Sequence, residues 1–144
     1  MRKLLLWFVM FLVFTIAQAS STDAIEVFIG DGNSISLSSN GKILYLNIAS
    51  GAVIYDISNR ITKVGNISVN YSPVNRVIKI GNMIVSYDPS NRIAKIGNTE
   101  ITYDFAGRTS KIGDAVIAYD VISRVINIAG KIPDNIRLAS GQQQ

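Results

Sequence analysis

The stretch that decides the fold is residues 87–102, Tyr-Asp-Pro-Ser-Asn-Arg-Ile-Ala-Lys-Ile-Gly-Asn-Thr-Glu-Ile-Thr, because its pattern returns every 16 residues. The tyrosines are Tyr55, Tyr71, Tyr87, Tyr103 and Tyr119. The arginines are Arg60, Arg76, Arg92, Arg108 and Arg124. The lysines are Lys63, Lys79, Lys95 and Lys111, and Asn127 takes this position in the last copy. Five copies in one phase predict a repeat architecture in which each unit is one supersecondary element.

Each unit contains two turn signals separated by short strand-like segments. Residues 88–91, Asp-Pro-Ser-Asn, favour a turn because proline presets φ and asparagine tolerates a left-handed conformation. Residues 97–98, Gly-Asn, are typical of a two-residue hairpin loop, which pairs Ile96 with Thr99. The segments between the turns are rich in Ile, Val, Thr and Tyr, as strands are. We therefore predict an all-β fold, an antiparallel meander of β-hairpins from 16-residue repeats, with a parallel β-solenoid as the alternative.

The register of the meander depends on the length of the loop at the Asp-Pro-Ser-Asn turn. A four-residue loop places Tyr87 opposite Arg92 and Val85 opposite Ala94, and the Gly-Asn loop then places Arg92 opposite Tyr103. Every arginine would lie between two tyrosines, in a ladder stabilised by cation–π contacts. The same four residues also suit a three-residue bulged turn, which would flip the face at each turn.

The N-terminus resembles a secretory signal peptide. Residues 1–19 combine a positive start (Arg2 and Lys3), an apolar run over 4–16 and the small-residue site Ala-Gln-Ala at 17–19. The alternative is a membrane anchor, which needs about 20 apolar residues, and this run is shorter. Removal of residues 1–19 lowers the formal net charge from +4 to +2, which weakens any case for nucleic-acid or membrane-surface binding.

The rest of the chain divides into three parts by its relation to the repeat. Residues 20–54 are predicted to form an N-terminal cap and a degenerate repeat, and residues 55–134 the five 16-residue hairpin repeats. Residues 135–144 are predicted to be a C-terminal tail, with a closing strand or turn before a disordered end. Atypical copies at the ends of an array are expected, because they protect the open edges.

The composition argues against catalysis. The chain has no cysteine and no histidine, which excludes disulfides, thiolate or imidazole metal sites and His-activated nucleophiles. Calcium needs about six to eight oxygen ligands, and the recurring aspartates supply one carboxylate per turn. We expect them to cap the backbone of their own turns instead. These aspartates are Asp56, Asp88, Asp104 and Asp120. We predict no enzyme, no metal and no cofactor.

Three segments resemble a known family of repeats. Residues 55–60, 87–92 and 103–108 are similar to the YD, or Rhs-type, repeat, whose signature is Tyr-Asp-x-x-Gly-Arg followed by an aliphatic residue. The resemblance covers residues 55–130, with a shorter period, frequent Asn in place of Gly, and Ser72 in place of one aspartate. It implies β-structure and export, by likeness to short exported bacterial proteins made of such repeats, and it implies no activity.

Two hypotheses of function follow. The first is an exported protein, periplasmic or extracellular after signal cleavage, with a non-catalytic structural or interaction role at a bacterial cell envelope. The second is a glycan- or envelope-binding module that uses a Tyr/Arg face. The candidate face comprises Tyr71, Arg76, Tyr87, Arg92, Tyr103 and Arg108. The expected partners are a cell-envelope glycan, another envelope protein, or a second copy through strand edges, with no nucleic acid and no membrane span after cleavage.

Overall fold

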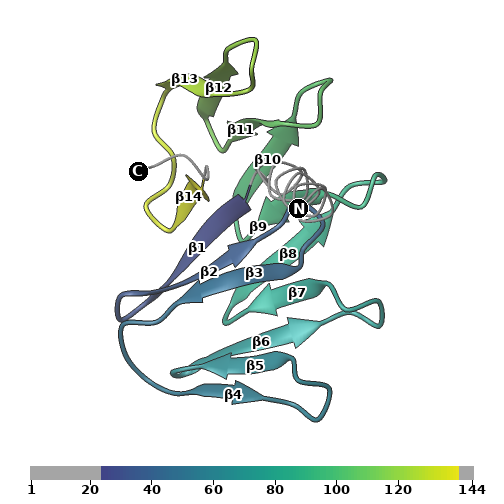
Figure 1. Ribbon diagram of the computed structural model, residues 1–144, viewed down its shortest axis with the longest axis vertical. Helices are drawn as coiled ribbons and strands as arrows, with labels where there is room; N and C mark the ends of the chain where they lie inside the picture. The colour runs from purple at the N-terminus through teal and green to yellow at the C-terminus, as the bar shows by residue number, and fades with distance from the viewer. Residues whose placement is uncertain (1–23, 140–144) are drawn as a thin grey trace, which may run out of the picture.

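The computed structural model describes residues 24–139, in which every regular element is a β-strand and all pairings are antiparallel (Figure 1). The predicted all-β meander of hairpins is confirmed, and the solenoid alternative is wrong. The predicted signal peptide at 1–19 and the end of the predicted tail at 140–144 lie outside the described residues. Residues 24–139 contain no helix with the length and hydropathy that crossing a membrane would require.

The repeats form the larger sheet, in which ten strands follow one another in chain order. The strands that carry the tyrosines are β4 (Val53–Tyr55), β6 (Ile67–Tyr71), β8 (Met83–Tyr87), β10 (Thr99–Tyr103) and β12 (Ala115–Tyr119). The strands that follow the arginines are β5 (Ile61–Val64), β7 (Val77–Ile80), β9 (Ile93–Ile96), β11 (Thr109–Ile112) and β13 (Val125–Ala129). Strands β4 and β13 are the two edges, and they lie at opposite ends of the long axis of the molecule (Figure 1).

A second, four-stranded sheet is built from the first three strands and the last strand of the described residues, in the order β14-β1-β2-β3. Its strands are β1 (Ala24–Gly30), β2 (Asn33–Leu37), β3 (Ile43–Asn47) and β14 (Ile136–Ala139). The residues assigned to a cap and a C-terminal tail therefore meet in one sheet, and the closing strand predicted before the disordered end is β14. The sequence did not predict that these segments would pair, because they are off the 16-residue period.

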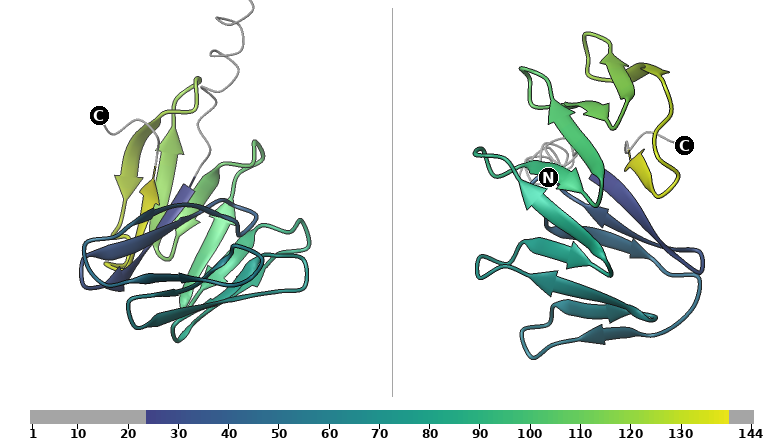
Figure 2. Two further views of the ribbon diagram at one scale, coloured as in Figure 1. Left: turned by 60° about the horizontal axis from the view of Figure 1, so that its bottom comes forward. Right: turned by 180° about the vertical axis from the view of Figure 1, so that it is seen from behind.

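The core lies between the two sheets, which Figure 2 shows one in front of the other. Ile25, Val27, Ile35 and Leu37 line it from the smaller sheet, where apolar residues alternate along β1 and β2. The larger sheet contributes Val64, Val69, Val77, Ile80, Val85, Ile93, Ile96, Ile101, Ile112 and Ile117. With no disulfide in the chain, burial of these aliphatic side chains is the main stabilising contribution.

The two kinds of turn differ in how well the sequence predicted them. The Gly-Asn loop has the predicted form, because Ile96 pairs with Thr99. The prediction of a four-residue loop at 88–91 is wrong. The amide of Asp88 donates to the carbonyl of Arg92 at 2.8 Å, and Asn91 has a φ of 62°. These features define the three-residue bulged turn that was the alternative.

A second irregularity in the same hairpin corrects the predicted pairing. Tyr87 lies opposite Ile93 and not opposite Arg92, while Val85 lies opposite Ile96 and not opposite Ala94. The register shifts between Ser86 and Tyr87, so Ala94 is an extra residue on β9. This bulge restores the face that the turn would have flipped, and it allows Ile93 and Ile96, three positions apart, to enter the same core. The same shift occurs in all five repeat hairpins.

One repeat places a polar side chain at a core position. Thr109 follows Arg108, is fully buried, and its hydroxyl has no hydrogen-bond partner within the described chain. The equivalent residues Val77 and Ile93 are aliphatic and equally buried. A buried hydroxyl without a partner costs about 1–3 kcal/mol.

Thr109→Val is therefore expected to raise the free energy of unfolding by about 1 kcal/mol, because valine has nearly the same shape and no unpaired group. Urea denaturation at 25 °C measures the gain. Thr102→Val is the matched control, because Thr102 is exposed and its hydroxyl lies 3.2 Å from that of Ser110. Equal effects of the two substitutions would contradict the interpretation that the buried hydroxyl of Thr109 destabilises the fold.

Candidate functional site

The recurring aspartates each close their own turn. One carboxylate oxygen of Asp88 accepts hydrogen bonds from the amides of Ser90 and Arg92, both at 2.9 Å. The other accepts from Nε of Arg92 at 2.9 Å. Burial alone would raise the pKa of Asp88, but the hydrogen bonds from Arg92 outweigh it and lower the pKa. Asp56, Asp104 and Asp120 make the same contacts with Arg60, Arg108 and Arg124.

These contacts confirm that the aspartates cap their own turns. Both carboxylate oxygens are engaged within one hairpin. In residues 24–139 no three potential metal-ligating side chains come together.

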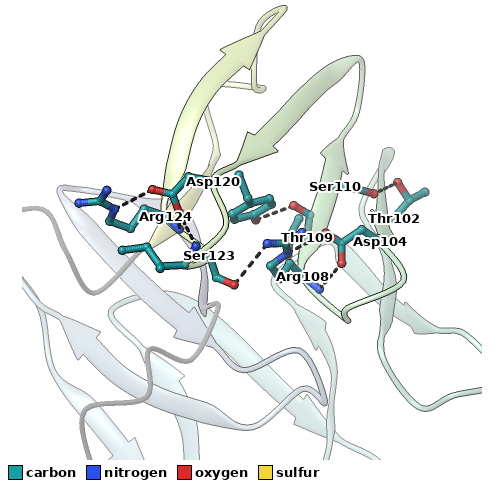
Figure 3. A network of polar contacts seen from close by, with 10 residues as sticks. Thr102, Asp104, Arg108, Thr109, Ser110, Asp120, Ser123 and Arg124 are labelled. Atoms are coloured by element: carbon teal, nitrogen blue, oxygen red, sulfur yellow. Dashed lines mark hydrogen bonds and ion pairs between the residues drawn. The ribbon is translucent and has the colours of Figure 1, made fainter.

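Each of four arginines also reaches forward to the next repeat, over whose tyrosine ring its guanidinium lies. The distances from the guanidinium carbon to the ring centroid are 4.9 Å for Arg60 and Tyr71, 4.4 Å for Arg76 and Tyr87, 4.5 Å for Arg92 and Tyr103, and 4.6 Å for Arg108 and Tyr119. In three of the four, the guanidinium also donates to the side chain at the left-handed position of the next turn, which after Arg92 is Gly107. These bonds join Arg60 to Asn75, Arg76 to Asn91 and Arg108 to Ser123 (Figure 3 shows the last).

Each of these tyrosines reaches back to the preceding repeat. Its hydroxyl donates to the carbonyl of the residue that follows the arginine stacked on its ring. The distances are 2.6 Å from Tyr71 to Ile61, 2.9 Å from Tyr103 to Ile93 and 2.6 Å from Tyr119 to Thr109, and Tyr87 makes the same bond to Val77. Burial raises the pKa of Tyr87 to about 12, although the Arg76 guanidinium opposes the rise. The hydroxyl of Tyr87 therefore stays a neutral donor at physiological pH.

The aspartate, arginine and following tyrosine form a unit that we call the repeat cassette. Every residue of the candidate face belongs to one. Arg76 stacks on Tyr87 and Arg92 on Tyr103. Tyr71 is stacked by Arg60, and Arg108 stacks on Tyr119. The predicted ladder is corrected here, because the tyrosine of an arginine's own repeat lies opposite the residue after that arginine. The rings are half-buried and one face of each is covered, so this set connects neighbouring repeats.

One cassette lacks its carboxylate. Ser72 stands where the other repeats have aspartate, and its hydroxyl accepts a hydrogen bond from the amide of Arg76 at 3.3 Å. Nε of Arg76 is buried and has no hydrogen-bond partner within residues 24–139. The guanidinium keeps its contacts with Tyr87 and Asn91, so only the aspartate half is missing.

Ser72→Asp is expected to raise the free energy of unfolding by about 1 kcal/mol at pH 7, because a carboxylate would satisfy Nε of Arg76. The matched control is Ser72→Asn, which can cap the turn but carries no charge. A gain no larger than that of the asparagine variant would contradict the interpretation.

The gain in the free energy of unfolding from Ser72→Asp should depend on pH. Hydrogen bonds to Arg60 and Arg124 lower the pKa of Asp56 and Asp120 in the folded chain. A carboxyl with a lowered folded pKa stabilises above its unfolded pKa, about 3.9. The advantage of Ser72→Asp should therefore be full above about pH 5 and disappear as the pH falls below about 4.

An open concavity lies at the start of the array, and we call it the N-end groove. It has a volume of about 620 Å³ and is lined by strand β3 and by the first cassette. Tyr45 and Tyr55 present aromatic surface there, and the exposed Lys42 presents positive charge, whereas the charge of Arg60 is paired with Asp56 at 2.8 Å. Tyr45 and Tyr55 are about half exposed, in contrast to the four cassette tyrosines.

Sequence reasoning missed this groove. Tyr45 is off the 16-residue period, and it belongs to the smaller sheet, which was not predicted. One signal was present for Tyr55: it is the first tyrosine of the series, and Leu44 stands where a preceding arginine would be. Tyr55 is therefore the one repeat tyrosine with no cassette arginine before it.

Comparison of the chain with protein-family models, with curated proteins and with solved structures found no match.

Proposed function

We propose that the chain is an exported, non-catalytic β-repeat protein with a structural or interaction role at a bacterial cell envelope. The observation that supports this most is the use of the repeated polar residues. Asp88, Arg92 and Tyr103 direct their polar groups to one another and to the backbone. Residues that recur for chemistry would converge on a cleft, whereas these connect each hairpin to the next.

The export part of the proposal rests on the sequence of residues 1–19. The experiment is expression of the full chain in a bacterial host, followed by cell fractionation and intact-mass measurement. We expect a periplasmic or secreted product that has lost the mass of residues 1–19. A cytoplasmic product with the full mass would overturn the proposed export.

The structural part is tested by removing single cassette contacts. Tyr103→Phe deletes the hydroxyl that donates to Ile93 across the repeat junction. We expect a loss of about 1 kcal/mol in the free energy of unfolding, with no change in the β-type circular dichroism spectrum. Tyr45→Phe is the control, because Tyr45 lies outside the repeats and is half exposed. Equal stability of the two variants would contradict the structural role.

A second candidate function is glycan binding in the N-end groove. The groove combines two exposed tyrosine rings with the exposed cation of Lys42, which suits an anionic sugar chain. This candidate uses different residues from those of the candidate face, of which only Tyr71 lines the groove.

Calorimetric titration with hyaluronate oligomers, and with neutral N-acetylglucosamine oligomers for comparison, tests this candidate. We expect binding of the anionic oligomer that falls at least tenfold in Tyr55→Ser and is unchanged in Ile84→Ser, whose side chain is exposed on a central strand. Absence of binding to both oligomers, or an equal effect of the two variants, would count against glycan recognition.

A further inference from the structure

Where one repeat meets the next, the strand after an arginine pairs with the strand that carries the next tyrosine, and we call this contact a repeat junction. The N-terminal edge of the larger sheet carries half of such a junction. Tyr55 on β4 is 53% exposed, and within residues 24–139 no guanidinium lies over its ring. Val53 is partly exposed, whereas the equivalent Val69 and Val85 on β6 and β8 are buried. This edge therefore has the tyrosine and the core position of a junction but lacks the preceding arginine strand.

The C-terminal edge carries the other half. The Arg124 side chain is 59% exposed, while those of Arg60, Arg92 and Arg108 are between 28% and 37% exposed. Arg124 is still held by Asp120 at 2.8 Å, in the geometry that presents the other arginines to the next tyrosine. Ile128 is 42% exposed, although its equivalents at the ends of β5, β7, β9 and β11 are buried.

Neither edge carries the charge that usually prevents strand pairing. Natural edge strands are commonly blunted by lysine, and each internal arginine strand of this sheet has one. On the open strand β13 that position is Asn127, and the strand reads Val-Ile-Asn-Ile-Ala. Strand β4 reads Val-Ile-Tyr and follows the small residues Gly51 and Ala52.

We propose that these two edges are complementary and that the chain associates head to tail, with β13 of one copy pairing antiparallel with β4 of the next. The internal junction between β5 and β6, where Lys63 pairs with Ser68, sets the register. Transferred to the ends, it pairs Asn127 with Ala52 of the next copy. Tyr55 of that copy then lies under Arg124, and its hydroxyl donates to the carbonyl of Val125.

The geometry makes the contact heterologous. Strands β4 and β13 lie at opposite ends of the molecule, so one chain cannot join its own edges (Figure 1). A heterologous contact without ring closure adds copies in one direction, which gives a linear assembly that extends the sheet. This inference names a partner for the interaction role proposed above, and to that extent rests on it.

Disulfide trapping tests the register directly, because the chain has no cysteine of its own. Asn127 and Ala52 are both exposed, and residues facing each other at a non-hydrogen-bonded position of an antiparallel pair are close enough for a disulfide. An A52C chain and an N127C chain are mixed under mild oxidation. We expect the mixed dimer to exceed either homodimer at least fivefold, and a chain with both substitutions to form a ladder of oligomers.

The matched control replaces N127C with K95C, which carries the cysteine at the same repeat position on the internal strand β9. A mixed dimer no more abundant than with K95C would overturn the proposal, and so would a predominance of homodimers. Such a failure would leave the structural role standing if Tyr103→Phe still destabilised the fold.

A second pair of variants tests the apolar contact. Ile128→Asp in the N127C chain should abolish trapping, because it places a charge at a core position of the new junction. Ile84→Asp should leave trapping unchanged, because Ile84 is exposed and faces Lys79 on the outer side of the sheet. Equal trapping in both variants would also overturn the proposal, and circular dichroism confirms that each chain is folded.

Discussion

Gly41→Ala is expected to lower the free energy of unfolding by about 4 kcal/mol. Gly41 lies in the turn between β2 and β3 with a φ of +80°, and its missing side chain leaves room for Tyr87. A Cβ added there would lie 1.8 Å from the hydroxyl of Tyr87 and 2.6 Å from the adjacent ring carbon. The left-handed φ adds a cost of about 1–2 kcal/mol to that overlap.

Neither partner in this contact can move away without losing other interactions. The carbonyl of Gly41 accepts a hydrogen bond from the amide of Val77 at 2.9 Å, and the hydroxyl of Tyr87 donates to the carbonyl of the same Val77. The ring of Tyr87 is also covered by Arg76 at 4.4 Å. The turn that connects two strands of the smaller sheet is thus fixed to the middle of the larger one.

Gly107→Ala separates the two costs of Gly41→Ala, which are the overlap with Tyr87 and the strain of the left-handed backbone. Gly107 has a φ of +82°, and nothing would lie within 4 Å of an added Cβ. Urea denaturation should therefore show a loss of about 1–2 kcal/mol for Gly107→Ala, from backbone strain alone. In a Tyr87→Leu background, Gly41→Ala should cost no more than Gly107→Ala. Equal losses for the two glycines in the native background would refute the proposed clash.

The part of the fold that the sequence predicted is the part determined by local, repeated signals. Turn residues at Gly97 and Asn98 determine a hairpin by their own φ preferences, so their pairing could be predicted. The turn at 88–91 suits two loop lengths, and no local signal distinguishes them. The choice depends on the core, because only a bulge at Ala94 places Ile93 and Ile96 on one face.

The second sheet and the N-end groove could not be predicted, for a related reason. Strand β14 pairs with β1 across more than 100 residues, and a single sequence carries no periodic signal for that contact. Tyr45 and Tyr55 lie near each other because β3 and β4 belong to different sheets that pack together. The sequence predicted one of the two tyrosine contacts of each arginine correctly. Arg92 was expected near Tyr103, where it lies, but its expected contact with Tyr87 depended on the wrong loop length.

Arg137→Ala is expected to lower the free energy of unfolding by about 3 kcal/mol, because it leaves a buried carboxylate without its cation. Glu26 on β1 is 3% exposed. It accepts hydrogen bonds from Nε of Arg137 on β14 at 2.9 Å and from the hydroxyl of Ser34 on β2 at 2.5 Å. These contacts join β14 to β1 and β2 of the smaller sheet.

A double-mutant cycle with Glu26→Gln identifies the source of that loss. If the unpaired charge dominates, Arg137→Ala should cost less than about 1 kcal/mol in the Glu26→Gln background, because a neutral amide can remain buried beside Ser34. Arg137→Lys should lie between, since lysine keeps the charge but cannot present two donors to one carboxylate. If the loss instead came from packing of Arg137 over Phe28, at 5.4 Å from the ring centroid, it would persist unchanged in the Glu26→Gln background. Urea denaturation of the four chains of the cycle at pH 7 therefore decides which interaction stabilises the pairing of β1 with β14, the buried charge or the aromatic contact.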